Sequence, residues 1–200
     1  MKFILAFTLL ISLTLRGASQ LSWKLVKNKN GIKVSVATVE NSRFKSIRVQ
    51  LVVDGTISKL FNILSNMNQA VEWVYRTKTS SVLKRLNPYE FFYYTETLMP
   101  WPVNNRDAII HLTINPDTAN HILIVNALSV PDYIEKKNGM VRIPYSKASW
   151  HVTEANHKLD IDYCFEVNPG GSLPAWLVNM MADKGPYESF SKLKIKLKEQ

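Results

Sequence analysis

The feature that most constrains the fold is a change of pattern near residue 168, where alternating strands give way to one long helix. The change begins with Pro169-Gly170-Gly171, which predicts a chain reversal because glycine adopts left-handed backbone conformations at little cost. Ser172 is placed to cap the exposed amides of the helix, and Pro174 is tolerated in the first helical turn. A long helix laid across a curved antiparallel sheet leaves a cavity between the two, and we expect that cavity to be the functional part of the molecule.

Stretches in which apolar and polar residues alternate precede this helix, and a period of two predicts β-strands. They are residues 32–36, 47–51, 82–86, 90–98, 106–114, 122–128, 148–154 and 159–167. Residues 58–74 instead carry apolar side chains three and four positions apart, which predicts one or two short helices. Residues 23–30 are a polar lead-in for which a helix is one option. The order predicts an α+β protein, with two short helices after the second strand and a curved antiparallel sheet around the C-terminal helix.

The N-terminus has the pattern of a signal peptide. Lys2 precedes an apolar run over residues 3–15, which is short for a membrane span and typical of a signal-peptide core. Small residues at 17–19 offer a cleavage site. We therefore expect residues 1–19 to be a signal peptide and residues 20–200 to form one domain. An uncleaved anchor and a first buried helix are the alternatives.

The charge of the chain points to anionic partners. The formal net charge is +9, and loss of residues 1–19 would delete Lys2 and Arg16 and no acid, which leaves +7. Such a surface favours lipid headgroups or nucleic acid. Export and the scattered placement of the basic residues argue against nucleic acid, so we expect transient contact with a membrane surface. Cys164 is the only cysteine, and the histidines lack a metal-binding spacing, so no metal or cofactor is expected.

Three stretches of the chain carry a resemblance to a known family: Met99–Asp107, which contains Pro-Trp-Pro-Val and Arg-Asp, Gly139–Ile143, and Asn168–Trp176. Together they resemble the START lipid-transfer domain family, which has the helix-grip (Bet v 1-like) fold. Their order spans about residues 21 to 200, and the predicted signal makes the chain similar to a secreted bacterial-type member, most simply a periplasmic one. The resemblance implies a tunnel for one apolar ligand, with an entrance near the loop before Arg106.

The resemblance also implies a function and a set of ligand contacts. START proteins bind sterols, phospholipids or sphingolipids and most are not enzymes, so we expect a monomeric carrier of a single lipid or other hydrophobic molecule. Sterol-binding members would carry a cavity arginine at the position of Leu112, and leucine there favours a more apolar tunnel. The candidate ligand-binding residues are Tyr94, Met99, Trp101, Arg106, Leu112, Trp176, Leu177, Met180 and Met181.

Each candidate has a structural alternative. Arg106 either anchors a headgroup or holds the loop before it through hydrogen bonds, and only one of Arg106 and Asp107 can face a cavity because adjacent residues point to opposite sheet faces. The apolar loop over residues 98–103 either touches a membrane, where Trp prefers the interface, or folds back on the core. The apolar residues that begin the C-terminal helix either line the ligand or form ordinary core.

Three functions follow from these alternatives. The first is a lipid carrier. The second is an enzyme of the cyclase or dehydratase type, in which Tyr93, Tyr94 and Glu96 would form an acid–base group in the same pocket. The third is an interaction module whose pocket is filled by its own side chains. No hydrolase, P-loop or dinucleotide motif is present, which favours the carrier.

Overall fold

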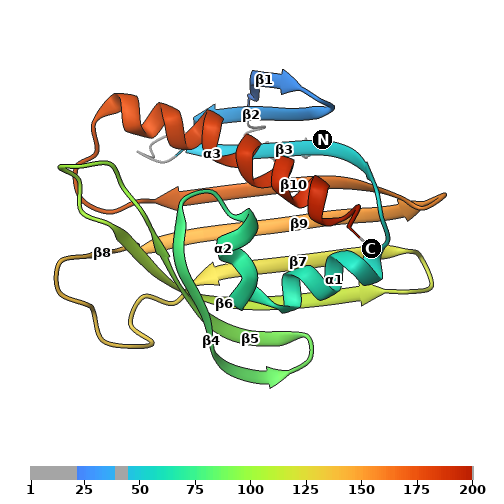
Figure 1. Ribbon diagram of the computed structural model, residues 1–200, viewed down its shortest axis with the longest axis horizontal. Helices are drawn as coiled ribbons and strands as arrows, with labels where there is room; N and C mark the ends of the chain where they lie inside the picture. The colour runs from blue at the N-terminus through green and yellow to red at the C-terminus, as the bar shows by residue number, and fades with distance from the viewer. Residues whose placement is uncertain (1–21, 39–44, 200) are drawn as a thin grey trace, which may run out of the picture.

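The computed structural model describes residues 22–38 and 45–199, and the predicted signal peptide, residues 1–19, lies outside this part of the chain. Three strands come first, then three short helical segments, seven more strands and a long helix (Figure 1). The elements are β1 (Lys24–Lys29), β2 (Ile32–Thr38), β3 (Lys45–Asp54), α1 (Ile57–Ser65), a 3-10 helix (Met67–Gln69), α2 (Ala70–Trp73), β4 (Thr77–Asn87), β5 (Glu90–Thr97), β6 (Arg106–Asp117), β7 (Ile122–Ser129), β8 (Val141–Arg142), β9 (Tyr145–Ala155), β10 (Lys158–Asn168) and α3 (Ala175–Lys196).

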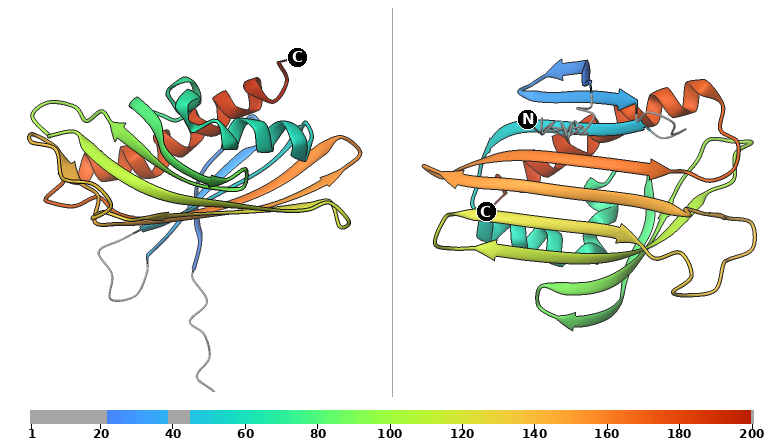
Figure 2. Two further views of the ribbon diagram at one scale, coloured as in Figure 1. Left: turned by 90° about the horizontal axis from the view of Figure 1, so that it is seen from below. Right: turned by 180° about the vertical axis from the view of Figure 1, so that it is seen from behind.

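The strands form one curved sheet in the order β1-β2-β3-β10-β9-β7-β6-β5-β4, with β8 added in parallel beside β6. The pairings along this path are antiparallel. Figure 2 shows that the three helices lie on one face of the sheet, which curves toward them. The predicted α+β helix-grip fold, an antiparallel curved sheet with a C-terminal helix, is thereby confirmed.

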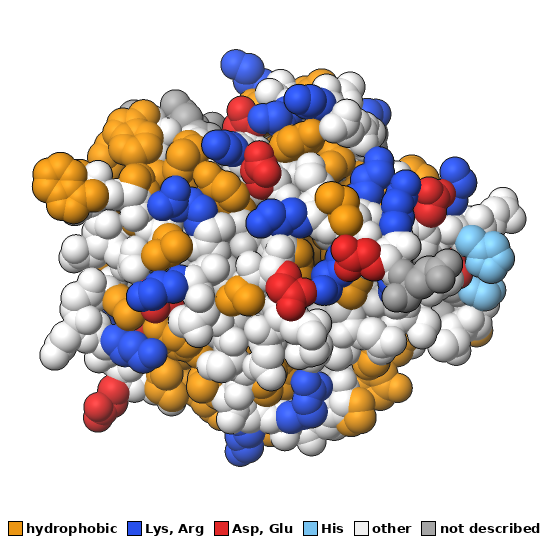
Figure 3. All heavy atoms as spheres, viewed as in Figure 1, with side chains coloured by type: hydrophobic (Ala, Val, Ile, Leu, Met, Phe, Trp, Pro, Cys, Tyr) orange, Lys and Arg blue, Asp and Glu red, His pale blue; other side chains and the backbone are white. Residues whose placement is uncertain are grey.

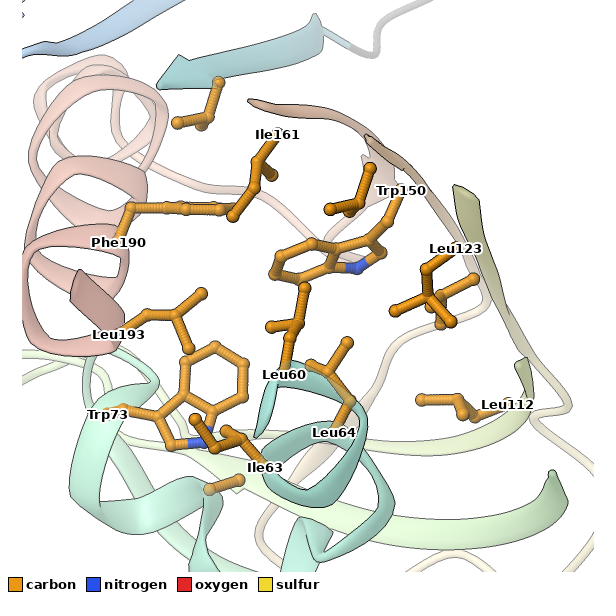
Figure 4. Packing of buried hydrophobic residues seen from close by; sticks show 14 of the residues in the cluster. Leu60, Ile63, Leu64, Trp73, Leu112, Leu123, Trp150, Ile161, Phe190 and Leu193 are labelled. Atoms are coloured by element: carbon orange, nitrogen blue, oxygen red, sulfur yellow. The ribbon is translucent and has the colours of Figure 1, made fainter. Parts of the chain in front are cut away.

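The core lies between the concave face of the sheet and the helices. On β10, Leu159 and Ile161 are fully buried while Asp160 is exposed, as alternation requires. Thr56 is the N-cap of helix α1, and its Oγ1 accepts a hydrogen bond from the amide of Lys59 at 3.3 Å. Figure 4 shows the side chains that meet in this layer: Leu60, Ile63, Leu64, Trp73, Leu112, Leu123, Trp150, Ile161, Phe190 and Leu193.

The chain reversal before α3 is formed as predicted. Gly170 and Gly171 have φ values of +66° and +61°, and a Cβ atom on Gly170 would lie 3.0 Å from Cγ1 of Val141. Only glycine therefore fits this turn without a shift of its neighbours. The predicted cap was wrong, because the helix begins after Pro174 and no side chain caps its amides. Ser172 lies outside the helix.

Two strands were missed by the sequence analysis. The polar lead-in forms β1, which pairs with β2, so the short helices follow the third strand of the chain rather than the second. Strand β8 has only two residues, Val141 and Arg142, which is too short for a periodic pattern. Within the described ranges, no helix has the length and apolar character needed to cross a membrane.

Candidate functional site

A cavity lies between the concave face of the sheet and the helices α2 and α3. Its volume is about 270 Å³, close to the lower end of the range for ligand pockets, about 300–1,000 Å³. The wall is mostly apolar and comes from β5, β6, β9, β10, α2 and α3. Aromatic side chains supply its inner part: Trp150, Tyr163 and Phe190 pack against one another with ring centroids 4.7 to 5.2 Å apart.

The cavity brings together five of the nine predicted ligand-binding residues. Met99 and Arg106 come from the loop after β5 and the start of β6, and Leu112 lies further along β6. Met180 and Met181 come from the first half of α3. All five line the cavity wall. The Pro-Trp-Pro loop and the start of α3, which the sequence analysis singled out, therefore each contribute to the cavity.

The other four predicted residues do not line the cavity. Trp101 and Trp176 have 92% and 54% of their surfaces exposed, because each lies at the outside of a loop or helix end. Leu177 is fully buried against the protein rather than at the cavity wall. These three residues and Tyr94 therefore lie off the cavity wall, and contact of any of them with a ligand stays a prediction.

The phase of β5 explains why Tyr94 lies off the cavity wall. Tyr93, Thr95 and Thr97 face the cavity, so Tyr94 and Glu96 face the other side of the sheet. The Tyr94 hydroxyl lies 3.6 Å from the sulfur of Met140, and the Lys137 ammonium lies 3.9 Å from the centre of its ring. Burial is the largest cause that raises the pKa of Tyr94 above its ordinary value.

Glu96 is held on that outer side by two donors. Its Oε1 accepts hydrogen bonds from Lys78 Nζ at 3.0 Å and from Asn105 Nδ2 at 2.8 Å. Asn105 Oδ1 in turn accepts from the amide of Met99 at 3.0 Å. The carboxylate thus fixes the Pro-Trp-Pro loop from behind, and the acid–base group considered for an enzyme is not assembled in the cavity.

A buried ion pair supports the cavity from the same side. The guanidinium of Arg142 donates to both carboxylate oxygens of Asp107, at 2.9 and 3.0 Å, and both side chains are almost fully buried. Arg142 also donates to the carbonyls of Pro131, Ile134 and Glu135. One side chain therefore pins the long connection between β7 and β8 to the sheet, a role that sequence reasoning did not find.

Arg106 faces the opposite way from Asp107 and lines the cavity. Only 2% of its surface is exposed. Its guanidinium donates to the carbonyl of Asn104 and, at 3.4 Å, to the carbonyl of Gly170, while Nε has no partner. Burial lowers the pKa of this guanidinium. Arg106 thus braces the loop, as one of the two alternatives predicted, and it also forms part of the cavity wall, while contact with a headgroup stays a prediction.

Three further polar groups lie in the wall, and the sequence analysis named only Tyr93 among them, as part of the acid–base group. The phenols of Tyr93 and Tyr163 face the cavity from β5 and β10, and burial raises the pKa of each well above the ordinary tyrosine value. The indole Nε1 of Trp73 is buried with no hydrogen-bond acceptor. The period-two pattern could have predicted that both tyrosines face the cavity, because each lies in phase with apolar residues of its own strand.

The start of α3 and the Pro-Trp-Pro loop lie at one end of the cavity. Leu98, Trp101 and Trp176 are exposed there, and Leu98 also lines the cavity. Figure 3 shows large apolar side chains gathered at the left-hand end of this face, where Figure 1 places the start of α3 and the loop between β5 and β6. Further along α3, Ser189 accepts a hydrogen bond from the amide of Tyr75 at 2.9 Å and donates to the carbonyl of Gly185 at 3.0 Å. The second half of the helix is therefore tied to the loop after α2.

The residues described in the structure hold no cluster of three or more His, Cys, Asp or Glu side chains arranged to bind a metal ion. The charged residues that the structure describes in the cavity wall are arginines, and the other described wall residues are apolar or aromatic with a few hydroxyl groups. Such an arrangement can bind and orient an amphiphile, since a few polar groups in an apolar pocket fix the orientation of a ligand.

The curved antiparallel sheet, the long C-terminal helix and the cavity between them define a protein of the helix-grip class. The sequence matches the START domain over residues 8–200, and the chain belongs to the START domain family. It is similar to the crystal structure of a STAR-related lipid transfer protein from Xanthomonas axonopodis, with a TM-score of 0.81 and 30% identity, over 88% of this chain and 99% of that one.

Two curated relatives extend the similarity. The phosphatidylcholine transfer protein of Rattus norvegicus is 27% identical over 173 residues, which cover 82% of this chain and 78% of that protein. An uncharacterized protein of Pseudomonas aeruginosa is 27% identical over 173 residues, which cover 86% of this chain and 85% of that protein.

Proposed function

We propose that this protein binds one lipid or other hydrophobic molecule in the cavity between the sheet and α3, and carries it between membranes. The observation that carries the proposal is the cavity itself, which has an apolar wall and a volume of about 270 Å³ inside a well-packed fold. Packed protein interiors leave few such voids, so a cavity of this size favours a ligand over the filled-pocket interaction module. The names of two relatives, which describe lipid transfer, agree with this proposal.

The ligand would enter at the end where Met99 and Met180 line the cavity. Methionine adapts to irregular apolar shapes, and burial of apolar surface contributes roughly 2.5 kcal/mol per 100 Å². Exposed Trp101 and Trp176 at the same end would contact the membrane, since indole rings prefer the interface between headgroups and acyl chains. The net positive charge would strengthen transient docking on an anionic leaflet.

The contacts we propose for the ligand are Met99, Arg106, Leu112, Met180 and Met181. The enzyme alternative is less well supported, because Tyr94 and Glu96 face away from the cavity and only Tyr93 of that group lines it. We also propose that the protein acts as a monomer in the periplasm after removal of residues 1–19. N-terminal sequencing of protein from the periplasmic fraction tests the export step, and an intact Met1 there would contradict it.

The test of the carrier function is extraction of the protein purified without detergent, followed by mass spectrometry of the extract. We expect a stoichiometric lipid-like molecule in the wild type. Ala108 is buried at the cavity wall, so Ala108→Phe should lower the lipid content, while Ser81→Phe at an exposed position of β4 serves as the matched control. A wild-type protein that is empty and also fails to take up fluorescent lipids would contradict the proposal.

A further inference from the structure

Among the described residues, the charged side chains that line the cavity are all positive. They are Arg76 and Arg106, and none of the described wall residues is Asp or Glu. The other described arginines that are largely withdrawn from solvent have carboxylate partners: Arg142 pairs with Asp107, and Arg48 pairs with Asp162. Burial of a cation costs free energy unless the cation is paired with an anion. An arginine that faces a cavity without a neighbouring acid would therefore be stabilised by an anionic group of a bound ligand.

Arg106 is the more deeply buried of the two. Its partners within the described chain are two backbone carbonyls, those of Asn104 and Gly170, and its Nε donates to nothing. Neutral carbonyls satisfy part of the hydrogen-bonding capacity of the guanidinium and none of its charge. The nearest acid in sequence, Asp107, points to the opposite face, where Arg142 holds both of its oxygens. Glu96 is likewise directed away, toward Lys78 and Asn105.

Arg76 lies at the same end of the cavity. It immediately precedes Thr77, which pairs with Thr97 on β5, and Thr97 pairs with Arg106 on β6. Two strand spacings, about 10 Å, therefore separate the two backbones, and long side chains can reach into the space between them. The backbone of Arg76 has a φ of +56°, and its carbonyl accepts a hydrogen bond from the amide of Leu98 at 2.8 Å. The side-chain Nε of Arg76 donates to the carbonyl of Leu98, also at 2.8 Å. A left-handed conformation is uncommon for arginine, and here it sets the residue at the cavity mouth.

We infer that the ligand is an anionic amphiphile, whose carboxylate or phosphate ester binds at Arg106 with Arg76 beside it. The planar guanidinium matches the oxygens of both groups, which a neutral alcohol or ester cannot replace. The apolar tail then runs inward toward Leu112, Trp150 and Phe190. The inference rests on the proposed carrier function and deepens it by naming the charge of the cargo.

The test compares two probes that share one tail. The purified protein is delipidated, and fluorescence titrations measure binding of cis-parinaric acid and of its uncharged methyl ester at about pH 8, where a carboxylate is ionised. We expect the acid to bind at least about ten-fold more tightly than the ester, which corresponds to about 1.4 kcal/mol. The Arg106→Met variant should lose that preference, so that the acid and the ester bind with affinities within about two-fold of each other.

Matched variants separate the site from general charge effects. Lys84→Met removes one positive charge from an exposed position of β4 and should leave the preference unchanged. Arg106→Lys should retain part of it, because the charge remains and the planar fork is lost. Arg76→Met should reduce it. If Arg106→Met does not fold, the comparison of probes on the wild type and on Arg76→Met still decides the inference.

Competition with palmitate, hexadecyl phosphate, hexadecanol and inorganic phosphate identifies the anion. Displacement by palmitate supports a fatty-acid type of cargo, and displacement by hexadecyl phosphate supports a phosphate ester. Equal displacement by hexadecanol, or equal binding of acid and ester, would overturn the inference while leaving the carrier function intact. If inorganic phosphate is the only competitor that displaces the probe, the inference that the ligand is an amphiphile is overturned. Failure of both probes to bind would count against the carrier function itself.

Discussion

Removal of the buried cation at Arg142 should destabilise the protein far more than removal of a partly exposed one. In the Arg142→Met variant the carboxylate of Asp107, 1% exposed, would stay buried without its partner. Breaking a buried pair from one side costs about 3–5 kcal/mol. Three backbone carbonyls would lose a donor as well, which adds to the same effect. For a chain of this length the loss corresponds to a fall of roughly 6–20 °C in the melting temperature.

The matched control is Arg48→Met on β3. Arg48 also forms a two-oxygen pair, with Asp162, but about a third of each side chain is exposed, so the expected loss is about 0–1 kcal/mol. A second variant, Asp107→Leu combined with Arg142→Met, removes the whole pair and should recover much of the stability, because no buried charge is left alone.

Urea unfolding followed by circular dichroism measures the three variants and the wild type on one scale. The reasoning is refuted if Arg142→Met costs no more than Arg48→Met, or if the double variant is no more stable than Arg142→Met. Either result would mean that Asp107 is solvated or re-paired in the variant, and that the connection between β7 and β8 does not depend on this ion pair.

Three other predictions concern the core, the turn before α3 and the cavity phenols. Phe190→Ala should cost about 3–5 kcal/mol in urea unfolding, because Phe190 is 3% exposed and packs on two aromatic rings. Gly170→Ala should lower the melting temperature more than Gly171→Ala: both have positive φ, but only the first would place a Cβ against Val141, and equal effects would contradict the close contact. Burial raises the pKa of Tyr163, so the contribution of this phenol to folding stability is complete below the unfolded-state pKa of about 10 and is lost as the pH rises above that value. Absorbance titration should show the Tyr163 phenol ionising at a higher pH than free tyrosine, together with unfolding. Ionisation at the pH of free tyrosine while the protein stays folded would disprove this prediction.

The strands could be predicted wherever one face of the sheet is exposed to solvent and the other is buried. Leu159 and Ile161 alternate with Asp160 on β10, and that alternation reports directly which side is buried. Strand β1 carries no such signal, because its residues Lys24–Lys29 are mostly exposed on both sides at the edge of the sheet. Its strand conformation depends on backbone pairing with β2, which the side-chain pattern does not encode.

The cavity could be predicted only in part, for a reason visible on β5. Four aromatic residues follow one another there, so the sequence does not say which phase is inward. Tyr93 faces the cavity, yet Tyr94 is also buried, at 3% exposure, because the connection between β7 and β8 covers the outer face of the sheet at this point. The inner aromatic wall comes from β9, β10 and α3, and these elements meet only in the folded chain.

Arg106 and Asp107 show how one strand can direct a paired charge and an uncompensated charge to opposite faces of a sheet. They are adjacent, so the pleat directs them to opposite faces of β6. Asp107 meets a complete guanidinium and forms a closed pair that needs nothing more. Arg106 meets only carbonyls and open cavity, so its charge stays uncompensated within the described chain. The same alternation that makes the sheet therefore sets a fixed ion pair on one face and an anion-seeking group on the other, which is why we place the polar end of the cargo at Arg106 rather than at any other polar group of the wall.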